Sequence, residues 1–162
     1  MKLLVLGGTR FLGRHVVDAA LDRGDDVTIF TRGRLPVPWR AEVDASGVSP
    51  PTPSSASART PQVRGRLSTL VGDRDPRIAP GLRALESGMW DAVIDCSGYV
   101  PRVVEASARL LAARVSRYIF VSSMSVYAKT DRPNMGEDTR VATLDDPATE
   151  QVMEHYGALK AA

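Results

Sequence analysis

The chain opens with an apolar run, residues 3–6, that stops at Gly7 and Gly8 and passes directly into a helical pattern. A third glycine, Gly13, follows near the start of that helix in the stretch VLGGTRFLGRHVV. Turns need glycine for structural reasons alone, but a glycine turn between a buried strand and a helix also lets a phosphate approach the helix N-terminus. The strand–turn–helix context therefore favours a nucleotide-binding unit over a merely structural turn.

The same alternation continues along the chain. Runs rich in β-branched and aromatic residues predict further strands over residues 26–32, 67–71, 90–96 and 117–122. Helical patterns cover residues 11–23 and 79–87, a stretch from Pro101, and a stretch from near Asp146 and Pro147 to the end. Strands that are apolar on both faces and alternate with helices form parallel sheets. We therefore predict an α/β fold, a Rossmann-like doubly wound parallel sheet with helices on both sides.

The composition fits one domain with an apolar core. The chain has 162 residues, of which 43% are hydrophobic, and its net charge of +2 is too small to argue for a nucleic-acid partner. Its single cysteine, Cys96, excludes an intrachain disulfide and fits a reducing compartment. No signal peptide or membrane-spanning run is recognisable, and the histidines and Cys96 lack metal-site spacing. We expect a cytoplasmic protein without a metal site.

Residues 35–66 interrupt the pattern after the second expected strand. They hold most of the prolines, many Ser and Ala residues, and few large apolar side chains. Such a composition predicts a flexible or disordered insertion inside a single domain, residues 1–162, and we assign no function to the insertion.

The residues after the second and third strands indicate the cofactor. In dinucleotide-binding folds, an acidic residue after the second strand binds the ribose 2′-OH of NAD, whereas an arginine suits the 2′-phosphate of NADP. Arg32 stands there, so NADP is favoured over NAD, although an ordinary basic turn would look the same. Asp73 can accept a hydrogen bond from the adenine amino group or simply cap a turn. Arg10 lies in the glycine turn, where contact with phosphate and exposure to solvent are equally expected.

The last expected helix carries Tyr156 and Lys160, which share one face because they are four residues apart. A phenol has an ordinary pKa of about 10, and a neighbouring ammonium together with a cationic nicotinamide favours the phenolate. The pair can thus pass a proton to or from a substrate oxygen, although helices carry many such pairs by chance. Ser123 follows the fifth expected strand and can hold the reacting oxygen, or it belongs to a polar strand exit whose hydroxyls satisfy backbone groups.

Five motifs occur in order along the chain: GGTRFLG (7–13), GDRD (72–75), DAVIDCSG (91–98), VSSMSVYA (121–128) and YGALK (156–160). Together they resemble the extended or atypical short-chain dehydrogenases/reductases of the NAD-dependent epimerase/dehydratase type. The resemblance implies a catalytic set of Ser123, Tyr156 and Lys160. It also implies a cofactor site on the glycine turn and on the chain after the fourth strand, formed by Gly7, Gly8, Thr9, Arg10, Phe11, Leu12, Gly13, Cys96, Ser97 and Gly98.

The activity that this resemblance implies is that of an NAD(P)-dependent oxidoreductase, epimerase or dehydratase. Such an enzyme acts by hydride transfer on a small-molecule substrate that bears a hydroxyl or carbonyl group, such as a nucleotide sugar. The resemblance also implies homodimers that pair through the helices around residues 101–114 and from 147 onward. A membrane partner is not expected, and neither is nucleic acid.

Three departures from the family pattern leave other functions open. Arg10 replaces the middle glycine of the usual GGTGFxG, a variant that resembles a subgroup of epimerases, reductases and nucleic-acid-binding chloroplast proteins. The insertion over residues 35–66 is not typical. The chain ends two residues after Lys160, so we expect only the N-terminal part of such a protein, without the C-terminal substrate domain and with little activity alone. The alternatives are a non-catalytic dinucleotide- or RNA-binding protein and an inactive truncated fragment.

Overall fold

Five parallel strands form the sheet of this protein, whose computed structural model describes residues 1–37, 39, 65–131 and 133–162. The strands are β1 (Lys2–Leu6), β2 (Asp26–Thr31), β3 (Leu67–Val71), β4 (Trp90–Asp95) and β5 (Val115–Phe120). They lie in the order β3-β2-β1-β4-β5, and every neighbouring pair is parallel. This is the strand order of a Rossmann fold, so the predicted fold is confirmed. The predicted insertion over 35–66 falls largely outside the described residues.

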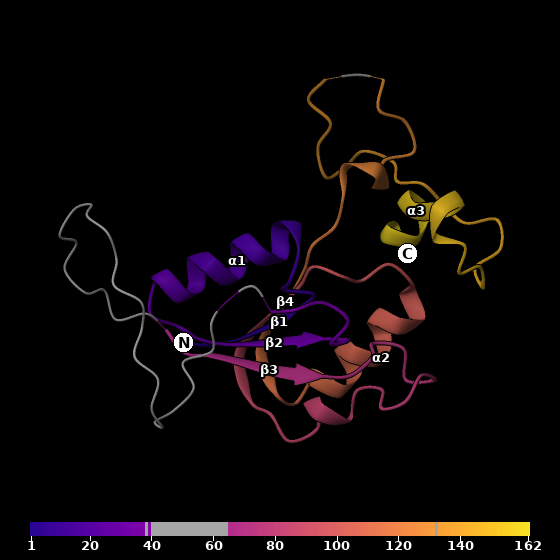
Figure 1. Ribbon diagram of the computed structural model, residues 1–162. Helices are drawn as coiled ribbons and strands as arrows, with labels where there is room; N and C mark the ends of the chain where they lie inside the picture. Colours follow the sequence, from indigo (N-terminus) through magenta and orange to yellow (C-terminus); the bar gives the residue numbers. More distant parts are fainter. Residues whose placement is uncertain (38, 40–64, 132) are drawn as a thin grey trace, which may run out of the picture.

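Helices cover both faces of the sheet (Figure 1). One face carries α1 (Phe11–Asp22), which joins a buried cluster of Leu3, Val5, Val17, Ala20, Leu21, Val27, Ile29 and Ala92. The other face carries α2 (Pro101–Leu111) and the 3₁₀ turn η1 (Arg83–Leu85), which join a second cluster of Leu4, Leu6, Phe30, Leu85, Trp90, Val93 and Leu111. Successive strand residues point to opposite faces, so the continuous apolar run of β1 serves both clusters.

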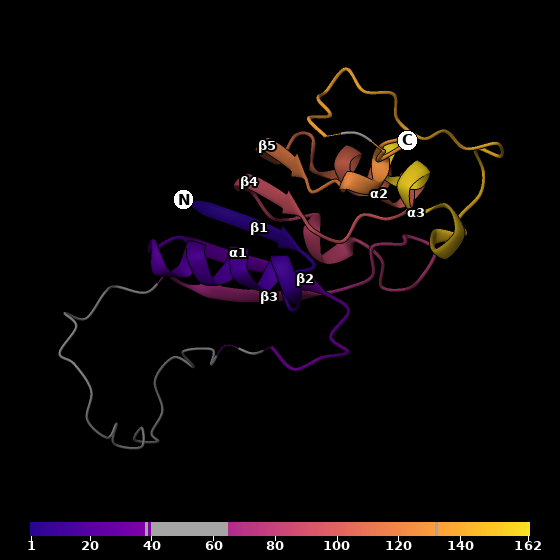
Figure 2. The same cartoon turned by 90° about the horizontal axis from the view of Figure 1, so that it is seen from above.

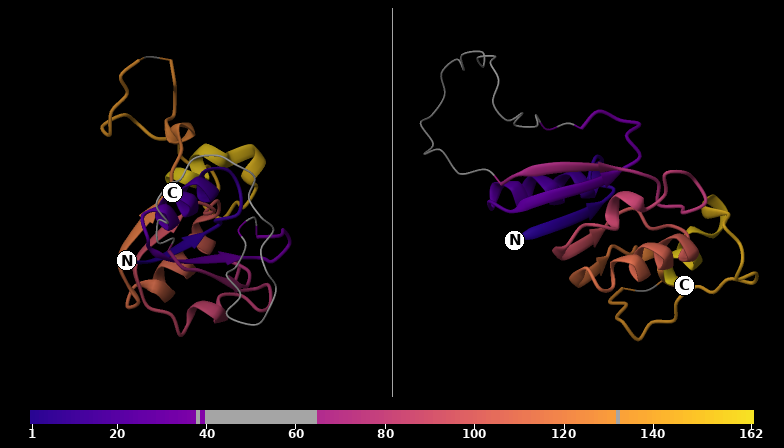
Figure 3. Two further views of the ribbon diagram at one scale, coloured as in Figure 1. Left: turned by 60° about the vertical axis from the view of Figure 1, so that its left-hand side comes forward. Right: turned by 90° about the horizontal axis from the view of Figure 1, so that it is seen from below.

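The remaining elements lie beyond the carboxyl ends of the strands (Figure 2). They are the 3₁₀ turn η2 (Met124–Val126) and the helix α3 (Val152–Ala161), which pack against each other. The N-terminus lies at the opposite end of the sheet from α3 (Figure 3). Parallel sheets bind ligands at their carboxyl edge, so the fold places η2 and α3 beside the region where a ligand is expected.

Two expected helices are shorter than predicted. Residues 79–87 form only the turn η1, because Gly81 has a φ of +62°, outside the helical region. The last helix begins at Val152, because the side chains of Asp146 and Thr149 accept hydrogen bonds from nearby backbone N–H groups and hold turns instead. β5 runs over 115–120 rather than 117–122. Among the described helices, none combines the length and the apolar character that crossing a membrane requires.

Candidate functional site

A cleft of about 560 Å³ opens at the carboxyl edge of the sheet, between the β1–α1 turn and the loops after β2, β3 and β4. Most residues that were predicted to bind a dinucleotide line it, namely Gly7, Thr9, Arg10, Phe11, Leu12, Gly13, Arg32, Asp73, Cys96 and Ser97. Gly8 and Gly98 are instead buried behind the lining, where Gly8 packs against Ile29 and Gly98 against Phe120. The structure thus brings segments that are distant in the sequence into one cavity.

The turn at the base of this cleft depends on two glycines. Gly7 has a φ of +86°, and a Cβ at this position would lie 2.6 Å from the Cβ of Ser97. A Cβ on Gly13 would lie 2.2 Å from the carbonyl oxygen of Gly7, so only glycine lets α1 start this close to β1. Among the described residues, no side chain caps the first turn of α1. Its N–H groups and the positive end of its dipole are therefore available to an anion in the cleft.

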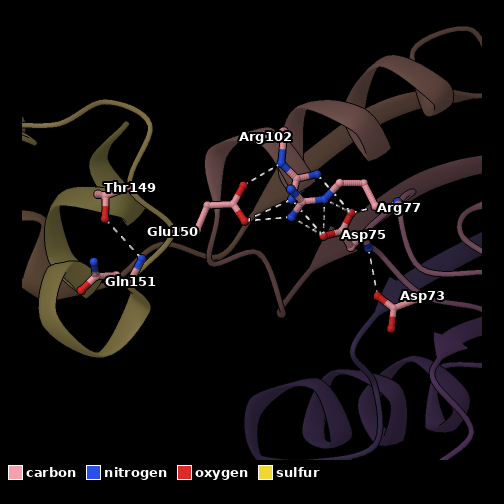
Figure 4. Close-up of polar contacts among 7 residues, drawn as sticks. All are labelled: Asp73, Asp75, Arg77, Arg102, Thr149, Glu150 and Gln151. Carbon is pink, nitrogen blue, oxygen red and sulfur yellow. Dashed lines mark hydrogen bonds and ion pairs between the residues drawn. The ribbon is translucent and has the colours of Figure 1, made fainter.

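Charged side chains stand around the mouth of the cleft. Arg10, Arg32 and Arg34 are exposed and line it, which favours an anionic ligand. Asp73 lines the cleft as well, and its Oδ1 accepts a hydrogen bond from Asp75 N at 3.0 Å (Figure 4). Asp73 thus holds a turn and also lines the cavity.

The floor of the cleft rests on a buried carboxylate that the sequence analysis did not single out. Asp95, at the end of β4, is fully buried and pairs with Arg74 at 2.5 Å. Burial raises the pKa of the neighbouring Cys96 thiol, and the negative charge of Asp95 adds to this effect. A raised pKa disfavours the reactive thiolate, and Cys96 lines the cleft as part of its floor. An ionisable residue inside the apolar stretch WDAVID was the available signal for this pair.

Ser123 and Tyr156 belong to two elements that a glycine contact holds together. Ser123 precedes η2, and its Oγ accepts a hydrogen bond from Ser125 N at 3.1 Å. A Cβ on Gly157 would lie 2.0 Å from the carbonyl oxygen of Ser125, so α3 approaches η2 as closely as only glycine permits. This contact explains the glycine in YGALK, because it places the residue after Tyr156 against the backbone two residues beyond Ser123.

Lys160 is buried, with 7% of its surface exposed. Its ammonium donates a hydrogen bond to the carbonyl oxygen of Val121 at 2.6 Å and lies 4.2 Å from the centroid of the Phe120 ring. Burial lowers the pKa of Lys160, whereas the negative charge of Asp95 opposes this shift. The contacts fix the cation at the carboxyl end of β5, where its field acts in a medium of low dielectric constant.

Tyr99 joins the cleft to α3, and it was not predicted from the sequence. It lines the cleft and is 45% exposed. Its ring lies 6.2 Å from the ring of Tyr156, tilted by 43°, and 5.4 Å from the ammonium of Lys160. The available signal was an aromatic residue directly after the glycine of DCSG, at the exit of β4. Through Tyr99, the cavity and the Tyr156–Lys160 pair share one wall.

An ion-pair cluster ties the segment before α3 to the rest of the molecule (Figure 4). Arg102, at the start of α2, contacts both oxygens of Asp75 at 3.1 and 2.9 Å and Glu150 at 2.7 Å. Arg77 contacts the same two carboxylates at 2.8 and 2.9 Å. The arginines hold the pKa of Asp75 and of Glu150 below their ordinary values. The cluster thus connects the loop that carries Asp73 with the segment that leads into the Tyr156 helix.

Comparison with known proteins shows the family. The sequence matches the NAD dependent epimerase/dehydratase family over residues 3–162, and the chain belongs to this family. It is 30% identical over 143 residues to the chloroplast stem-loop binding protein of 41 kDa b from Arabidopsis thaliana. That alignment covers 85% of this chain and 33% of the relative, so the chain spans about a third of that protein.

Solved structures of similar fold cover the chain almost completely. MoeE5 in complex with UDP-glucose and NAD is 20% identical with a TM-score of 0.61, covering 99% of this chain and 46% of that one. The enzyme WbmG of Bordetella bronchiseptica in complex with NAD is 16% identical with a TM-score of 0.62, over 99% and 47%. UDP-glucose 4-epimerase of Bifidobacterium longum in complex with NAD⁺ and UDP is 22% identical with a TM-score of 0.59, over 99% and 46%. At these identities the likeness establishes the fold.

Proposed function

We propose that this member of the NAD dependent epimerase/dehydratase family binds a nicotinamide dinucleotide in the cleft and acts as an oxidoreductase, epimerase or dehydratase. The observation that carries the proposal is the shared wall at Tyr99, which joins a glycine-turn cleft to the Tyr156–Lys160 pair. The cavity fits the cofactor's pyrophosphate, because a Cβ on Gly7 would close the space above Ser97 and the first N–H groups of α1 are free to donate. When bound, the nicotinamide accepts or supplies hydride.

The chain's own residues then handle the substrate oxygen and its proton. Tyr156 is the acid/base that takes a proton from a substrate hydroxyl or returns it to a carbonyl oxygen. Lys160 brings a positive charge to the site, since its buried ammonium is held at the end of β5. Ser123 holds the reacting oxygen, and it precedes η2, the turn against which Gly157 of α3 packs.

NADP is our proposed cofactor, ahead of NAD. Arg32 and Arg34 are exposed at the mouth of the cleft after β2, where a 2′-phosphate on the adenosine ribose would need cationic partners. Asp73 lies after the neighbouring strand, β3, and would accept a hydrogen bond from the adenine amino group. The similar structures hold NAD, so this preference is a point on which the chain would differ from them.

A nucleotide sugar is the proposed substrate class. UDP-glucose or UDP is named in two of the similar structures, which are about twice the length of the matched part. We also propose a cytoplasmic location, because the single cysteine fits a reducing compartment.

A titration with NADPH and with NADH tests cofactor binding. We expect saturable binding of both, with NADPH at least 10-fold tighter, because one good ion-paired phosphate contact is worth about 1.5–3 kcal/mol. Arg32→Ala should remove most of that preference, whereas Arg83→Ala, an exposed arginine outside the cleft, should leave it unchanged. Absence of saturable binding for both dinucleotides would refute the proposal.

Turnover tests the roles of the α3 residues. In a form of the protein that turns over UDP-glucose or a related nucleotide sugar, Tyr156→Phe should abolish turnover and leave cofactor affinity unchanged, because only the phenolic proton is removed. Equal turnover by the Tyr156→Phe variant would rule out the acid/base assignment.

RNA binding is the second candidate function. It is favoured by the 30% identity to a protein named for stem-loop binding and by the exposed arginines Arg10, Arg32 and Arg34. Binding to a labelled RNA stem-loop, measured over a salt series, separates the two. A tight complex whose affinity falls steeply with salt favours this candidate, and no complex at low salt excludes it.

A further inference from the structure

A buried polar network lies at the floor of the cleft. The side chain of Asp95 is fully buried, with 0% of its surface exposed, and the side chain of Arg74 is 11% exposed. Arg74 Nη1 lies 2.5 Å from Asp95 Oδ1, and Arg74 Nη2 donates to Ser107 Oγ on α2 at 2.6 Å. Tyr118 on β5 donates its hydroxyl to Asp95 Oδ2 at 2.8 Å. The pair therefore links β4, β5, α2 and the loop after β3.

This network makes direct contact with the floor of the cleft. The Ser97 backbone N–H donates to Asp95 Oδ1 at 3.0 Å, and Arg74 Nη1 lies 3.3 Å from Ser97 Oγ. Ser97 in turn lies against Gly7, where an added Cβ would be 2.6 Å from the Ser97 Cβ. The carboxylate thus fixes both the backbone and the side chain of the residue that faces the pyrophosphate turn.

Stability alone does not account for such a pair. Burying two charges costs desolvation that their attraction often only balances, and well-packed apolar residues of similar volume serve equally well or better. Within the described part of the chain, the Nε of Arg74 is also buried without a hydrogen-bond partner, which adds to the cost. What apolar residues would not reproduce are the two polar contacts to Ser97.

We propose that Arg74 and Asp95 are positioning residues for the cofactor cleft, which hold Ser97 at the separation from Gly7 that a dinucleotide pyrophosphate requires. The inference rests on the proposed function, since it takes the cleft as a dinucleotide site. Neither residue needs to take part in proton or hydride transfer. Arg74 also lines the cleft, but the positioning role acts through the backbone N–H and the hydroxyl of Ser97. Protection of the Ser97 amide therefore reports on positioning separately from the charge of Arg74.

The test separates folding from positioning with matched variants of the 162-residue chain. Arg74→Leu leaves the Asp95 carboxyl buried and unpaired and should destabilise the fold, whereas the double variant Arg74→Leu/Asp95→Leu should regain most of the stability. Tyr118→Phe is the control, because it removes one contact of Asp95 and leaves both contacts to Ser97. Each protein is melted thermally and titrated with NADPH and NADH, and exchange of the Ser97 amide hydrogen is followed by NMR.

We expect the double variant to melt near the unaltered chain, to bind the preferred dinucleotide at least 10-fold more weakly, and to lose protection of the Ser97 amide. Tyr118→Phe should bind within twofold of the unaltered chain. If the double variant fails to fold, Arg74→Lys replaces it, and a weakening of about threefold or more is expected because the planar fork is lost. Binding within twofold by a folded double variant, or by Arg74→Lys in its place, overturns the positioning role. Absence of dinucleotide binding by the unaltered chain overturns the proposed function and this inference with it.

Discussion

The two halves of the candidate site are held in different ways. The glycine turn directly follows the central strand β1, whose residues Leu4, Val5 and Leu6 have no exposed surface. The α3 half lies beyond the sheet (Figure 1) and keeps large exposed side chains, with Met153 96% and Met124 67% exposed. Its attachments are the Gly157 contact to η2, the Lys160 hydrogen bond to Val121, the Tyr99–Tyr156 contact and the ion-pair cluster at Glu150.

This difference indicates that one half of the site is rigid and the other can move. Parallel ladders and two apolar clusters fix the glycine-turn half before any ligand arrives, so its geometry is preorganised. Within α3, Leu159 is the buried apolar side chain. The other attachments of the α3 half are a few polar and aromatic side-chain contacts and one close backbone approach, and such regions open locally at low free energy. We therefore expect α3 to adjust to a ligand that the cleft already accommodates.

The largest expected effect is that of Gly13→Ala in the glycine-turn half. The new Cβ would meet the Gly7 carbonyl oxygen at 2.2 Å, a backbone atom that β1 holds in place. We expect the free energy of unfolding to fall by about 3 kcal/mol, the upper range for overpacking, as measured by urea denaturation. Gly136→Ala is the control, since its Cβ would meet only the Asp138 side chain in an exposed loop. If the two substitutions lower the free energy of unfolding equally, the close contact at Gly13 is not what makes the glycine-turn half rigid.

Gly157→Ala makes the same chemical change in the α3 half and should behave differently. Its Cβ would approach the Ser125 carbonyl oxygen even more closely, at 2.0 Å, but α3 and η2 can separate without opening the sheet. We expect the free energy of unfolding to change by less than about 1 kcal/mol, while amide protection over residues 152–161 is lost. A loss of stability as large as that of Gly13→Ala would show that α3 is part of the cooperative core.

The pH dependence of Lys160 gives a smaller effect with a definite sign. Burial lowers its pKa below 10.5, so between the folded and unfolded pKa values the unfolded chain binds more protons. Stability from this group therefore rises with pH through that interval. In Lys160→Met the rise is absent, and the stability difference between the unaltered chain and the variant should grow in favour of the former as pH approaches 10.5. If urea denaturation gives a stability difference between the two proteins that does not vary with pH, the Lys160 ammonium is not buried in the folded chain.

Glu150→Gln should have the smallest effect. Arg102 and Arg77 lower the pKa of Glu150, so its contribution is present above its ordinary pKa of 4.5 and is lost as pH falls through the lowered value. Because the cluster is open to solvent, we expect no resolvable change in global unfolding, but faster hydrogen exchange over 152–161 at neutral pH. Acid or high salt should produce the same change in the unaltered chain. Glu105→Gln, which breaks an exposed pair within α2, should not affect α3.

Much of this arrangement could be predicted from the sequence, because apolar runs and glycine turns act locally. The strands, α1 and α2 follow from hydrophobic patterns, and the alternation of elements sends Gly7, Asp73, Ser97 and Ser123 to one edge. Two helices were predicted to be too long, each for a local reason that a helical pattern does not show. These reasons are the positive φ of Gly81 and the side-chain turns at Asp146 and Thr149.

The contacts that define the site could not be predicted in this way, because their partners are remote in the sequence. Arg74 and Asp95 are 21 residues apart, and the residues of the ion pair between Arg77 and Glu150 are separated by 73. Neither spacing has a periodic signature, so each residue alone looks like an ordinary charged side chain. Tyr99 was missed for the same reason, since its meaning depends on the position of α3.

We propose that the glycine-turn cleft and α3 form one site. Hydrogen–deuterium exchange of the 162-residue chain, with and without saturating NADPH, tests it most directly. We expect slower exchange in three separate segments: residues 7–13, residues 96–98 and residues 152–161. Protection of the first two segments with no change in α3 would contradict the claim, because the cofactor would then occupy the cleft without involving the Tyr156–Lys160 pair.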